Sequence, residues 1–323
     1  MKFNRKNMIK IALLMAFLLG SFHVQVSAAF LEALWGTRPA ALAGAFTATA
    51  DDANAPAYNP AGVSLVTQNE LTFMYARLFS GVNLYSGEDT SRLGLGYFSY
   101  VPTIKDKAFG SYAISWTNMA ATNLYREDSF ALTVADSYEF DSLDTAPILS
   151  YGANIKLLKR SFSTDIRTNQ DPVFNSGRDS SALTLDAGII LRPNLSVLPG
   201  LNVGLAGQNL TEPNIGLNAQ DRVPLRLSFA LAYHDPSMPL VNPSFEIGRR
   251  NGRTLVTGAW EAWMAKDTLA FRLGANADEI GSGLGYKFQI MKKMQMRFDY
   301  AILWPLNVEG TSGRHRVSIS SAF

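Results

Sequence analysis

The feature that most constrains this chain is a two-residue alternation of apolar and polar side chains, which recurs from about residue 69 to the C-terminus. In one example, Leu225 and Leu227 alternate with Arg226 and Ser228. A helix would mix these two sets on one face, whereas an extended strand separates them onto opposite faces. The same period recurs at residues 183–192, 269–276 and 294–300. The sequence therefore predicts an all-β protein.

About fourteen such segments follow one another, each about ten to twelve residues long, which suits a tilted crossing of a bilayer. They are expected to begin near Glu70, Ser91, Lys107, Asp128, Pro147, Ser181, Gly200, Val223, Val241, Arg253, Asp267, Gly281, Lys293 and Gly313. Single-chain outer-membrane barrels have an even number of strands, short periplasmic turns and longer outer loops. The long connections at residues 161–180 and 211–222 fall on the outer side in this count. The prediction is a closed antiparallel transmembrane β-barrel.

A soluble β-sandwich is the alternative, because it also alternates. The distribution of aromatic residues favours the membrane barrel, since these residues gather near the expected strand ends, where interfacial girdles form. They are Tyr97, Tyr100, Trp116, Tyr233, Trp263, Tyr300 and Trp304.

The N-terminus has the layout of an export signal. Basic residues from Lys2 to Lys10 precede an apolar run at residues 11–19, and Val26-Ser27-Ala28 supplies the small residues that signal peptidase needs. The apolar run is shorter than the roughly twenty residues of a spanning helix, which argues against a membrane anchor. We therefore expect a signal peptide over residues 1–28, cleaved near Ala28, and location in a bacterial outer membrane.

Composition excludes several other classes. The chain has no Cys, so it cannot be a lipoprotein, a disulfide scaffold or a thiol enzyme. A net charge of +2 is too mild to indicate nucleic acid as a partner. Outside the leader only His234 and His315 remain, on distant strands, and no local motif joins either to a nucleophile or to metal ligands. We expect no enzyme activity, no metal and no cofactor.

Residues 29–67 are expected to form a hatch inside a barrel of residues 68–323. Their side chains are mostly small from Pro39 to Ala50, so the segment fits a crowded lumen. The motif Asn59-Pro60-Ala61-Gly62 has the residue preferences of a type I turn. This motif is a tight turn before the first strand and also a means of fixing the hatch, and the two interpretations are compatible.

Paired acids close the small-residue segment and suggest how the hatch is held. Our hypothesis is that Asp51 and Asp52 pair with luminal arginines and seat the hatch. Charges assigned to the lumen include Arg92, and the candidate hatch contacts among them are Arg226, Arg272, Arg297 and Arg316. The simpler explanation is a hydrated, polar lumen, as barrel interiors ordinarily are. Glycine pairs at residues 94–96 and 283–285 are expected where strands bend or the hatch backbone comes close.

Two further sets of residues are candidates for binding. A hydrophobic pocket beside the hatch could involve Phe46, Tyr58, Phe98, Trp260 and Met264, although aromatic residues in a plugged barrel more often only pack. The loop at residues 161–180 is a candidate partner-binding surface, because long loops commonly carry function. Its apolar residues are Phe162, Ile166, Val173 and Phe174. The alternative for this loop is a segment without a partner.

The hatch residues resemble the N-terminal hatch of the PorV/PorQ group of FadL-like outer-membrane proteins. The matching positions are Gly36, Arg38, Gly44, Ala45, Ala48, residues 50–52 and residues 59–62, with further matches at residues 207–216, 223–226, 299–301 and 313–319. The chain departs from the group at Leu42-Ala43-Gly44 and at Ala57-Tyr58. The resemblance spans the whole mature chain.

This resemblance implies a fourteen-stranded barrel plugged by its N-terminal segment, with Arg38 in the hatch motif and Phe323 as the aromatic residue that the barrel-assembly machinery reads. It implies one of two functions. PorV-like proteins work in type IX secretion, which would give this chain a translocon and cargo proteins as partners. FadL-like proteins pass long-chain fatty acids or other hydrophobic compounds across the outer membrane. The motif match favours secretion, and both roles stay open.

Overall fold

The computed structural model describes residues 29–30, 34–78, 93–103, 110–121, 124–140, 145–164, 168–235, 237–291 and 293–323. The expected signal peptide at residues 1–28, the luminal candidate Arg92 and the loop candidate Ile166 lie outside these residues. No helix in the described ranges is long and apolar enough to span a membrane.

In the described part of the chain, fourteen antiparallel strands form one closed sheet in which each strand pairs with its sequence neighbours and β1 pairs with β14. The strands are β1 Glu70–Arg77, β2 Leu93–Val101, β3 Ser111–Ala121, β4 Tyr125–Glu139, β5 Ile148–Phe162, β6 Asp179–Arg192, β7 Leu201–Gln208, β8 Arg226–Tyr233, β9 Asn242–Arg250, β10 Arg253–Met264, β11 Leu269–Ala275, β12 Glu279–Met291, β13 Met294–Pro305 and β14 Arg314–Ala322. Closure removes the sheet edges, as a barrel in lipid requires. The predicted barrel and strand number are confirmed.

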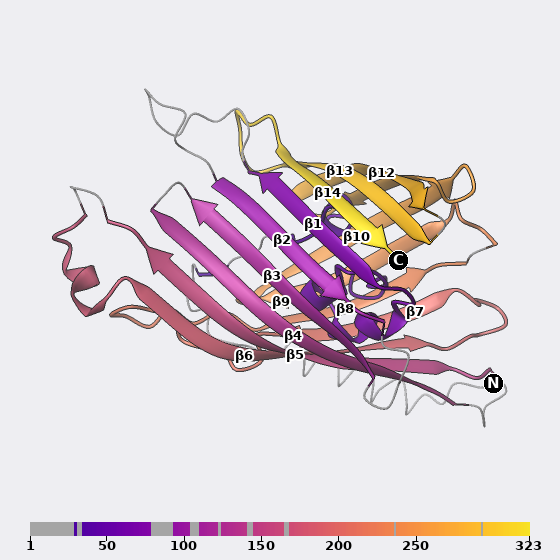
Figure 1. Cartoon of the computed structure of the whole chain (residues 1–323), viewed down its shortest axis with the longest axis horizontal. Helices are drawn as coiled ribbons and strands as arrows, with labels where there is room; N and C mark the ends of the chain where they lie inside the picture. The colour runs from indigo at the N-terminus through magenta and orange to yellow at the C-terminus, as the bar shows by residue number, and fades with distance from the viewer. Residues whose placement is uncertain are drawn as a thin grey trace.

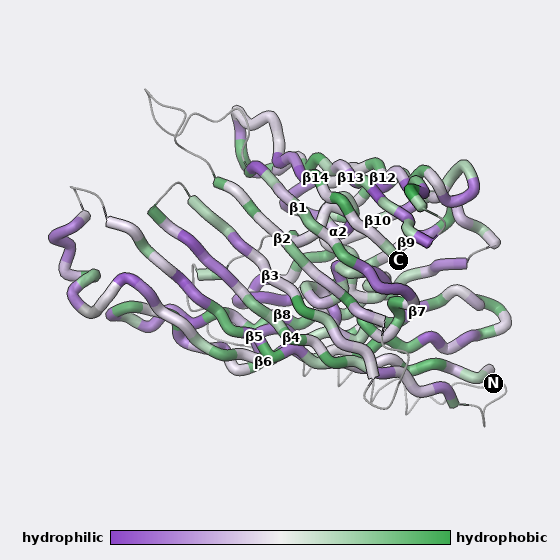
Figure 2. Tube along the Cα trace, in the orientation of Figure 1, coloured by the Kyte–Doolittle hydropathy of each residue, from purple (hydrophilic) through white to green (hydrophobic). Residues whose placement is uncertain are grey.

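The barrel has its polar residues inside and its apolar residues outside. On the outer face, Leu183 is 65% exposed and Ile155 is 57% exposed, whereas the luminal Arg272 and Asp299 are 0% exposed. Figure 2 shows the resulting alternation of hydrophobic and hydrophilic positions along the strands. A soluble sandwich would bury the first set and expose the second, so this distribution suits a barrel whose outer face is covered by lipid.

Two ends of the barrel can be told apart. At the turn end, β1 begins beside the end of β14, where the backbone N–H of Phe323 donates to the Asn69 carbonyl at 3.0 Å. At the loop end, the connections include residues 163–164 and 168–178, with the short helix η4 Pro172–Ser176, and residues 209–225. Strands β4 to β6 form the longest part of the barrel wall (Figure 1). These long connections lie on the side that the strand count assigned to the outer loops.

The N-terminal segment lies in the lumen, where Figure 1 shows it enclosed by the strands. Its elements are α2 Thr37–Ala41, η1 Ala55–Ala57 and η2 Pro60–Leu65. Helix η2 packs against β4, β5 and β6, and α2 packs against β12 and β13 on the opposite wall. We call residues 34–66 the hatch.

Two of the aromatic residues expected in a membrane girdle belong to the lumen instead. Tyr97 is 2% exposed and donates to the Ala53 carbonyl of the hatch at 2.9 Å. Trp263 is 7% exposed, and the Arg272 guanidinium lies over its ring. Both residues lie on the inward face of their strands, and Tyr97 also lies at the middle of β2, so neither is at the lipid boundary.

Candidate functional site: the luminal hatch

The Asn59–Gly62 turn ties the hatch to the barrel wall. The Asn59 side-chain oxygen accepts from the Ala61 N–H at 3.2 Å and so caps η2, as an N-cap residue does. Its amide nitrogen donates to the Thr47 carbonyl within the hatch at 2.9 Å and to the Ile189 carbonyl of β6 at 3.0 Å. The Gly62 N–H donates to the Asn59 carbonyl at 3.0 Å. One buried side chain therefore fixes the turn and its attachment.

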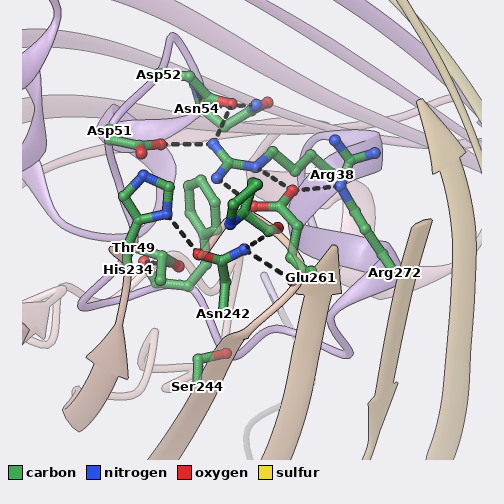
Figure 3. Close-up of polar contacts among 12 residues, drawn as sticks. Arg38, Thr49, Asp51, Asp52, Asn54, His234, Asn242, Ser244, Glu261 and Arg272 are labelled. Carbon is green, nitrogen blue, oxygen red and sulfur yellow. Dashed lines mark hydrogen bonds and ion pairs between the residues drawn. The ribbon is translucent and has the colours of Figure 1, made fainter. Parts of the chain in front are cut away.

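The hatch also joins a closed ring of six alternating charges, which we call the ion-pair ring. In order around the ring its members are Arg38, Glu261, Arg272, Asp299, Arg297 and Asp52. Each contact between neighbouring members is between 2.6 and 3.0 Å long. Figure 3 shows Arg38 between the hatch acids and Glu261, with Arg272 on the far side of Glu261. The hatch supplies two members, and β10, β11 and β13 supply the other four.

A glycine on β12 allows the ring to close. Strand β12 lies between β11, which carries Arg272, and β13, which carries Asp299. A Cβ atom on Gly285 would lie 2.5 Å from the Asp299 carboxylate and 2.8 Å from an Arg272 guanidinium nitrogen. Because Gly285 has no side chain, Arg272 can cross β12 and reach Asp299 at 2.7 Å.

Burial makes the ring strong and intolerant of a missing member. Burial alone would raise the pKa of Asp52, but the Arg38 and Arg297 guanidinium groups outweigh it, and the pKa lies well below its usual value. Asp52 also accepts from the Asn54 backbone N–H at 2.9 Å. Removing one partner of a buried ion pair costs about 3–5 kcal/mol, because it leaves the other charge uncompensated.

The two hatch acids do not have the same role. Asp52 contacts Arg297 of the wall at 2.9 Å, and Asp51 contacts only Arg38 of the hatch itself, at 2.5 Å, among the ion pairs of the described residues. The Asp51 side chain is 44% exposed, compared with 5% for Asp52. An ion pair at an exposed carboxylate contributes little to stability. The structure therefore assigns the contact with the wall to Asp52.

The four candidate arginines reach the hatch in different ways. Arg297 pairs with Asp52 directly, and Arg272 acts through Glu261. Arg316 donates to the Leu34 carbonyl of the hatch and contacts neither hatch acid. Arg226 pairs at 3.4 Å with Glu246, which itself binds the hatch backbone. Of the four arginines, Arg297 forms the direct ion pair between the wall and a hatch acid.

Glu246 forms a second attachment of the hatch. One of its carboxylate oxygens accepts from the backbone N–H groups of Phe46 at 3.1 Å and Thr47 at 3.0 Å. On the same strand, the Ser244 hydroxyl donates to the Ala45 carbonyl at 3.2 Å. Because hydrogen bonds to a charged acceptor are stronger than neutral ones, strand β9 holds this stretch of the hatch backbone firmly.

Luminal glycines leave room for the hatch backbone. A Cβ atom at Gly274 would lie 2.2 Å from the Leu42 carbonyl carbon, and one at Gly204 would lie 2.6 Å from the Thr47 carbonyl oxygen. Gly283 likewise faces Ala41 of the hatch, as expected from the sequence. Gly94 and Gly96 do not: a Cβ atom at either position would lie 3.8 Å from the nearest atoms, which belong to neighbouring strands. The expectation of close hatch approach is therefore wrong for that pair.

The five residues proposed for a hydrophobic pocket do not line one cavity. Phe46 and Tyr58 pack edge to face in the hatch, with ring centroids 5.3 Å apart. Trp260 and Met264 are 37% and 43% exposed on the outer face of β10, and Phe98 packs against the outward-facing Phe73. Alternation divides each strand into two faces, and these three residues lie on the face opposite the lumen.

Cavities lie on both sides of the hatch. A turn-end cavity of about 260 Å³ is bordered by Asp51, Asp52 and Arg297. A loop-end cavity of about 390 Å³ is bordered by Leu34 and Gly44 of the hatch together with arginines of β8, β9 and β10. A smaller space of about 90 Å³ lies beside Trp35 and Tyr58. The hatch therefore lies between two polar vestibules.

The loop candidates lie together at the top of the long wall. Phe162 packs against Phe174 with ring centroids 5.7 Å apart, and Val173 is 47% exposed. The Val173 carbonyl accepts from the Asn218 side chain at 2.8 Å, which joins this loop to the loop between β7 and β8. That second loop folds inward, where Ile215 is fully buried and packs with Leu158. The terminal Phe323 is 47% exposed at the turn end.

The most important residue that sequence reasoning missed is Glu261, which joins Arg38 to Arg272. The sequence does indicate that Glu261 faces the lumen, because alternation along β10 places it on the same face as Thr257 and Trp263. Sequence alone does not show which charges on different strands share a level, since that depends on the strand register. Among the described residues, no group of three or more potential His, Asp or Glu ligands could hold a metal ion.

Comparisons with known proteins give a match in structure only. No protein-family model matches the chain, and no curated protein matches its sequence. A Pseudomonas aeruginosa FadL homologue matches with a TM-score of 0.54 at 15% identity, over 92% of this chain and 99% of that one. The CymD monoaromatic hydrocarbon channel matches with a TM-score of 0.56 at 12% identity, over 89% and 97% of the two chains.

The Ralstonia pickettii toluene transporter TbuX matches to the same extent, with a TM-score of 0.56 at 12% identity over 89% of this chain and 97% of that one. These matches cover nearly the whole of each chain. At such low identities the likeness is one of fold. The chain has the closed fourteen-stranded fold of the FadL-like outer-membrane barrels.

Proposed function

We propose that this protein is an outer-membrane channel through which small hydrophobic compounds pass without an energy source, with the hatch as its gate. The observation that carries the proposal is the hatch, which is anchored to opposite walls of a closed barrel between two vestibules. The structural neighbours support a role in the passage of hydrophobic compounds, since they are described as a FadL homologue, a monoaromatic hydrocarbon channel and a toluene transporter.

The attachments of the hatch suggest how the gate is regulated. The ion-pair ring and Glu246 hold it through contacts on β9, β10, β11 and β13, whereas η2 rests against β4, β5 and β6. A buried ring opposes partial opening, because each displaced member leaves a charge without its partner. We propose that passage requires the hatch to separate from the wall at Glu261 and Arg297.

Outer-membrane lipid is the expected environment, and the barrel-assembly machinery is the expected partner during insertion, with Phe323 as its signal. The PorV/PorQ assignment and the type IX secretion role rest on the sequence resemblance alone. If that role is correct, the cluster of Phe162, Val173 and Phe174 is the surface where a translocon or cargo protein would bind.

Uptake by outer-membrane vesicles tests the proposal. Vesicles with and without the protein would be exposed to radiolabelled toluene or oleate, with sucrose as the hydrophilic control. We expect faster entry of the hydrophobic compound in the presence of the protein and unchanged entry of sucrose. Equal acceleration of sucrose would indicate a general pore, and no acceleration of either would contradict the proposal. Co-purification of secretion subunits or surface proteins with the gently extracted barrel would favour the secretion role.

A further inference from the structure

The outer wall of β3 to β6 changes from apolar to polar within one rung of paired residues. One rung consists of Trp116, Phe130, Leu157 and Leu183, and the next rung toward the loop end consists of Asn118, Asp128, Lys159 and Ser181. The indole of Trp116 stacks on Phe130 with ring centroids 6.4 Å apart. Aromatic residues in this position mark the edge of the apolar belt of a membrane barrel, so the second rung lies at the level of lipid headgroups.

On this outward face, the Asp128 carboxylate holds the Arg126 guanidinium in a fixed orientation. Asp128 accepts from the Trp116 indole N–H and from the Asn118 amide, each at 2.9 Å. It also binds Arg126 through two nitrogens, at 2.7 Å from Nε and 3.0 Å from Nη2. The Asp128 side chain is 8% exposed, whereas the Arg126 side chain is 54% exposed. Asp128 therefore orients Arg126 and leaves its remaining N–H groups facing outward.

A second cation lies beside this group on the same face. Lys159 is exposed and lies directly opposite Asp128 in the register of β4 and β5. Directly opposite side chains have Cβ atoms about 4.5–5.5 Å apart. The other acid of the patch, Asp179, lies on the rung of Arg126 but two strands away, since both residues are opposite Ser161 of β5. On the rung of Asp128, the exposed charge is therefore the Lys159 ammonium, and the Arg126 guanidinium lies one rung closer to the loop end.

We propose that Arg126 and Lys159, oriented by Asp128, bind the phosphate of a lipid headgroup in the leaflet at the loop end. An oriented guanidinium with an ammonium nearby suits a phosphate, which accepts several charge-assisted hydrogen bonds. The acyl chains of the same lipid would lie along Phe130, Leu157 and the apolar rungs below them. This site lies on the outside of the barrel, and it is independent of what passes through the lumen.

The test uses the purified full-length barrel in detergent and native mass spectrometry with a bis-phosphorylated lipid A. Replacing both cations, in Arg126→Gln with Lys159→Gln, should weaken binding about thirtyfold. A charge-matched control, Lys266→Gln with Lys293→Gln, removes two exposed cations at the turn end and should leave binding unchanged. Dephosphorylated lipid A should bind to wild type as weakly as the phosphorylated form binds to the Arg126 and Lys159 double variant.

The variant Asp128→Asn distinguishes binding of the lipid by an oriented Arg126 from binding by net charge alone. Removing a negative charge would strengthen attraction of a phosphate if only net charge mattered. If Asp128 orients Arg126, the same change should weaken binding at least threefold, and Arg126→Lys should also weaken it because the bidentate contact is lost. Stronger binding by Asp128→Asn, an equal loss in the turn-end control, or displacement of the lipid by equimolar pyrophosphate would overturn the proposal.

Discussion

The two adjacent acids of the hatch allow a sharp test of the ion-pair ring. Asp51 and Asp52 both bind Arg38, at 2.5 and 3.0 Å, but the Asp51 side chain is 44% exposed and the Asp52 side chain is 5% exposed. If burial determines the strength of these pairs, Asp52→Asn should release the hatch, whereas Asp51→Asn should barely affect it. The two variants remove the same charge from neighbouring positions, so each serves as the control for the other.

The expected magnitudes follow from the contacts that remain. Removing one partner of a buried pair costs about 3–5 kcal/mol. We expect about 3 kcal/mol for Asp52→Asn, the lower end, because Arg38 keeps Glu261 and Arg297 keeps Asp299. That free energy raises the equilibrium constant for hatch opening about a hundredfold. For Asp51→Asn we expect no more than about 1 kcal/mol, which is about fivefold.

Hydrogen exchange measured by mass spectrometry is the suitable assay, because it reports opening of the hatch separately from opening of the barrel strands. Amides in peptides covering residues 37–62 should exchange about a hundredfold faster in Asp52→Asn, while peptides from β4 and β5 should not change. Equal effects of the two variants would refute the reasoning from burial. Acceleration of the strands together with the hatch would show that the ring stabilises the whole barrel instead of seating the hatch.

Three further predictions concern the hatch and the loop end. Because the pKa of Asp52 is lowered in the folded protein, its contribution is complete above the unfolded value of about 3.9 and is lost as the pH falls toward the folded value. The protection factors of hatch amides, which correct for the intrinsic pH dependence of exchange, should therefore match at pH 7 and pH 5 and fall below about pH 4. Gly204→Val should displace the hatch and accelerate its exchange, whereas Gly258→Val, where a Cβ would meet no atom within 4 Å, should not; equal behaviour would contradict the close approach at β7. Arg160→Gln removes the 2.5 Å pair with Asp221 and should accelerate exchange in residues 209–225 by tenfold or more, and unchanged exchange there would show that Arg160 does not hold this loop.

The strand pattern could be predicted closely from the sequence. All fourteen expected starts lie within four residues of an observed strand start, and the widest gap is Lys107 against Ser111. This accuracy has a physical cause: lipid on one side and a polar lumen on the other impose a two-residue period on each crossing. The parity of the connections agreed less well, because the long turn expected at residues 136–146 falls on the side of the short turns.

The candidate site was only partly predictable. Arg272, Arg297 and Asp52 were expected to lie in the lumen, but their partners depend on which residues share a level on β10, β11 and β13. Alternation also leaves the inward set of a strand undefined when both sets contain large apolar residues, as on β10, where Trp263 faces inward and Trp260 outward. The inward fold of residues 209–225 depends on contacts distant in sequence, such as Arg160 with Asp221.

The closed form of the ion-pair ring constrains how this protein can change over evolutionary time. Each of the six members touches two neighbours of opposite sign, so reversing a single sign creates two repulsions at once. Replacing two adjacent members by uncharged residues of similar volume leaves the other four charges in an open chain. Only the two end charges of that chain then lack one partner, so this double change is less costly than a single reversal of sign. Relatives of this protein should therefore differ at positions 38, 52, 261, 272, 297 and 299 in concerted pairs, and Gly285 should remain without a side chain wherever residue 272 reaches across to residue 299.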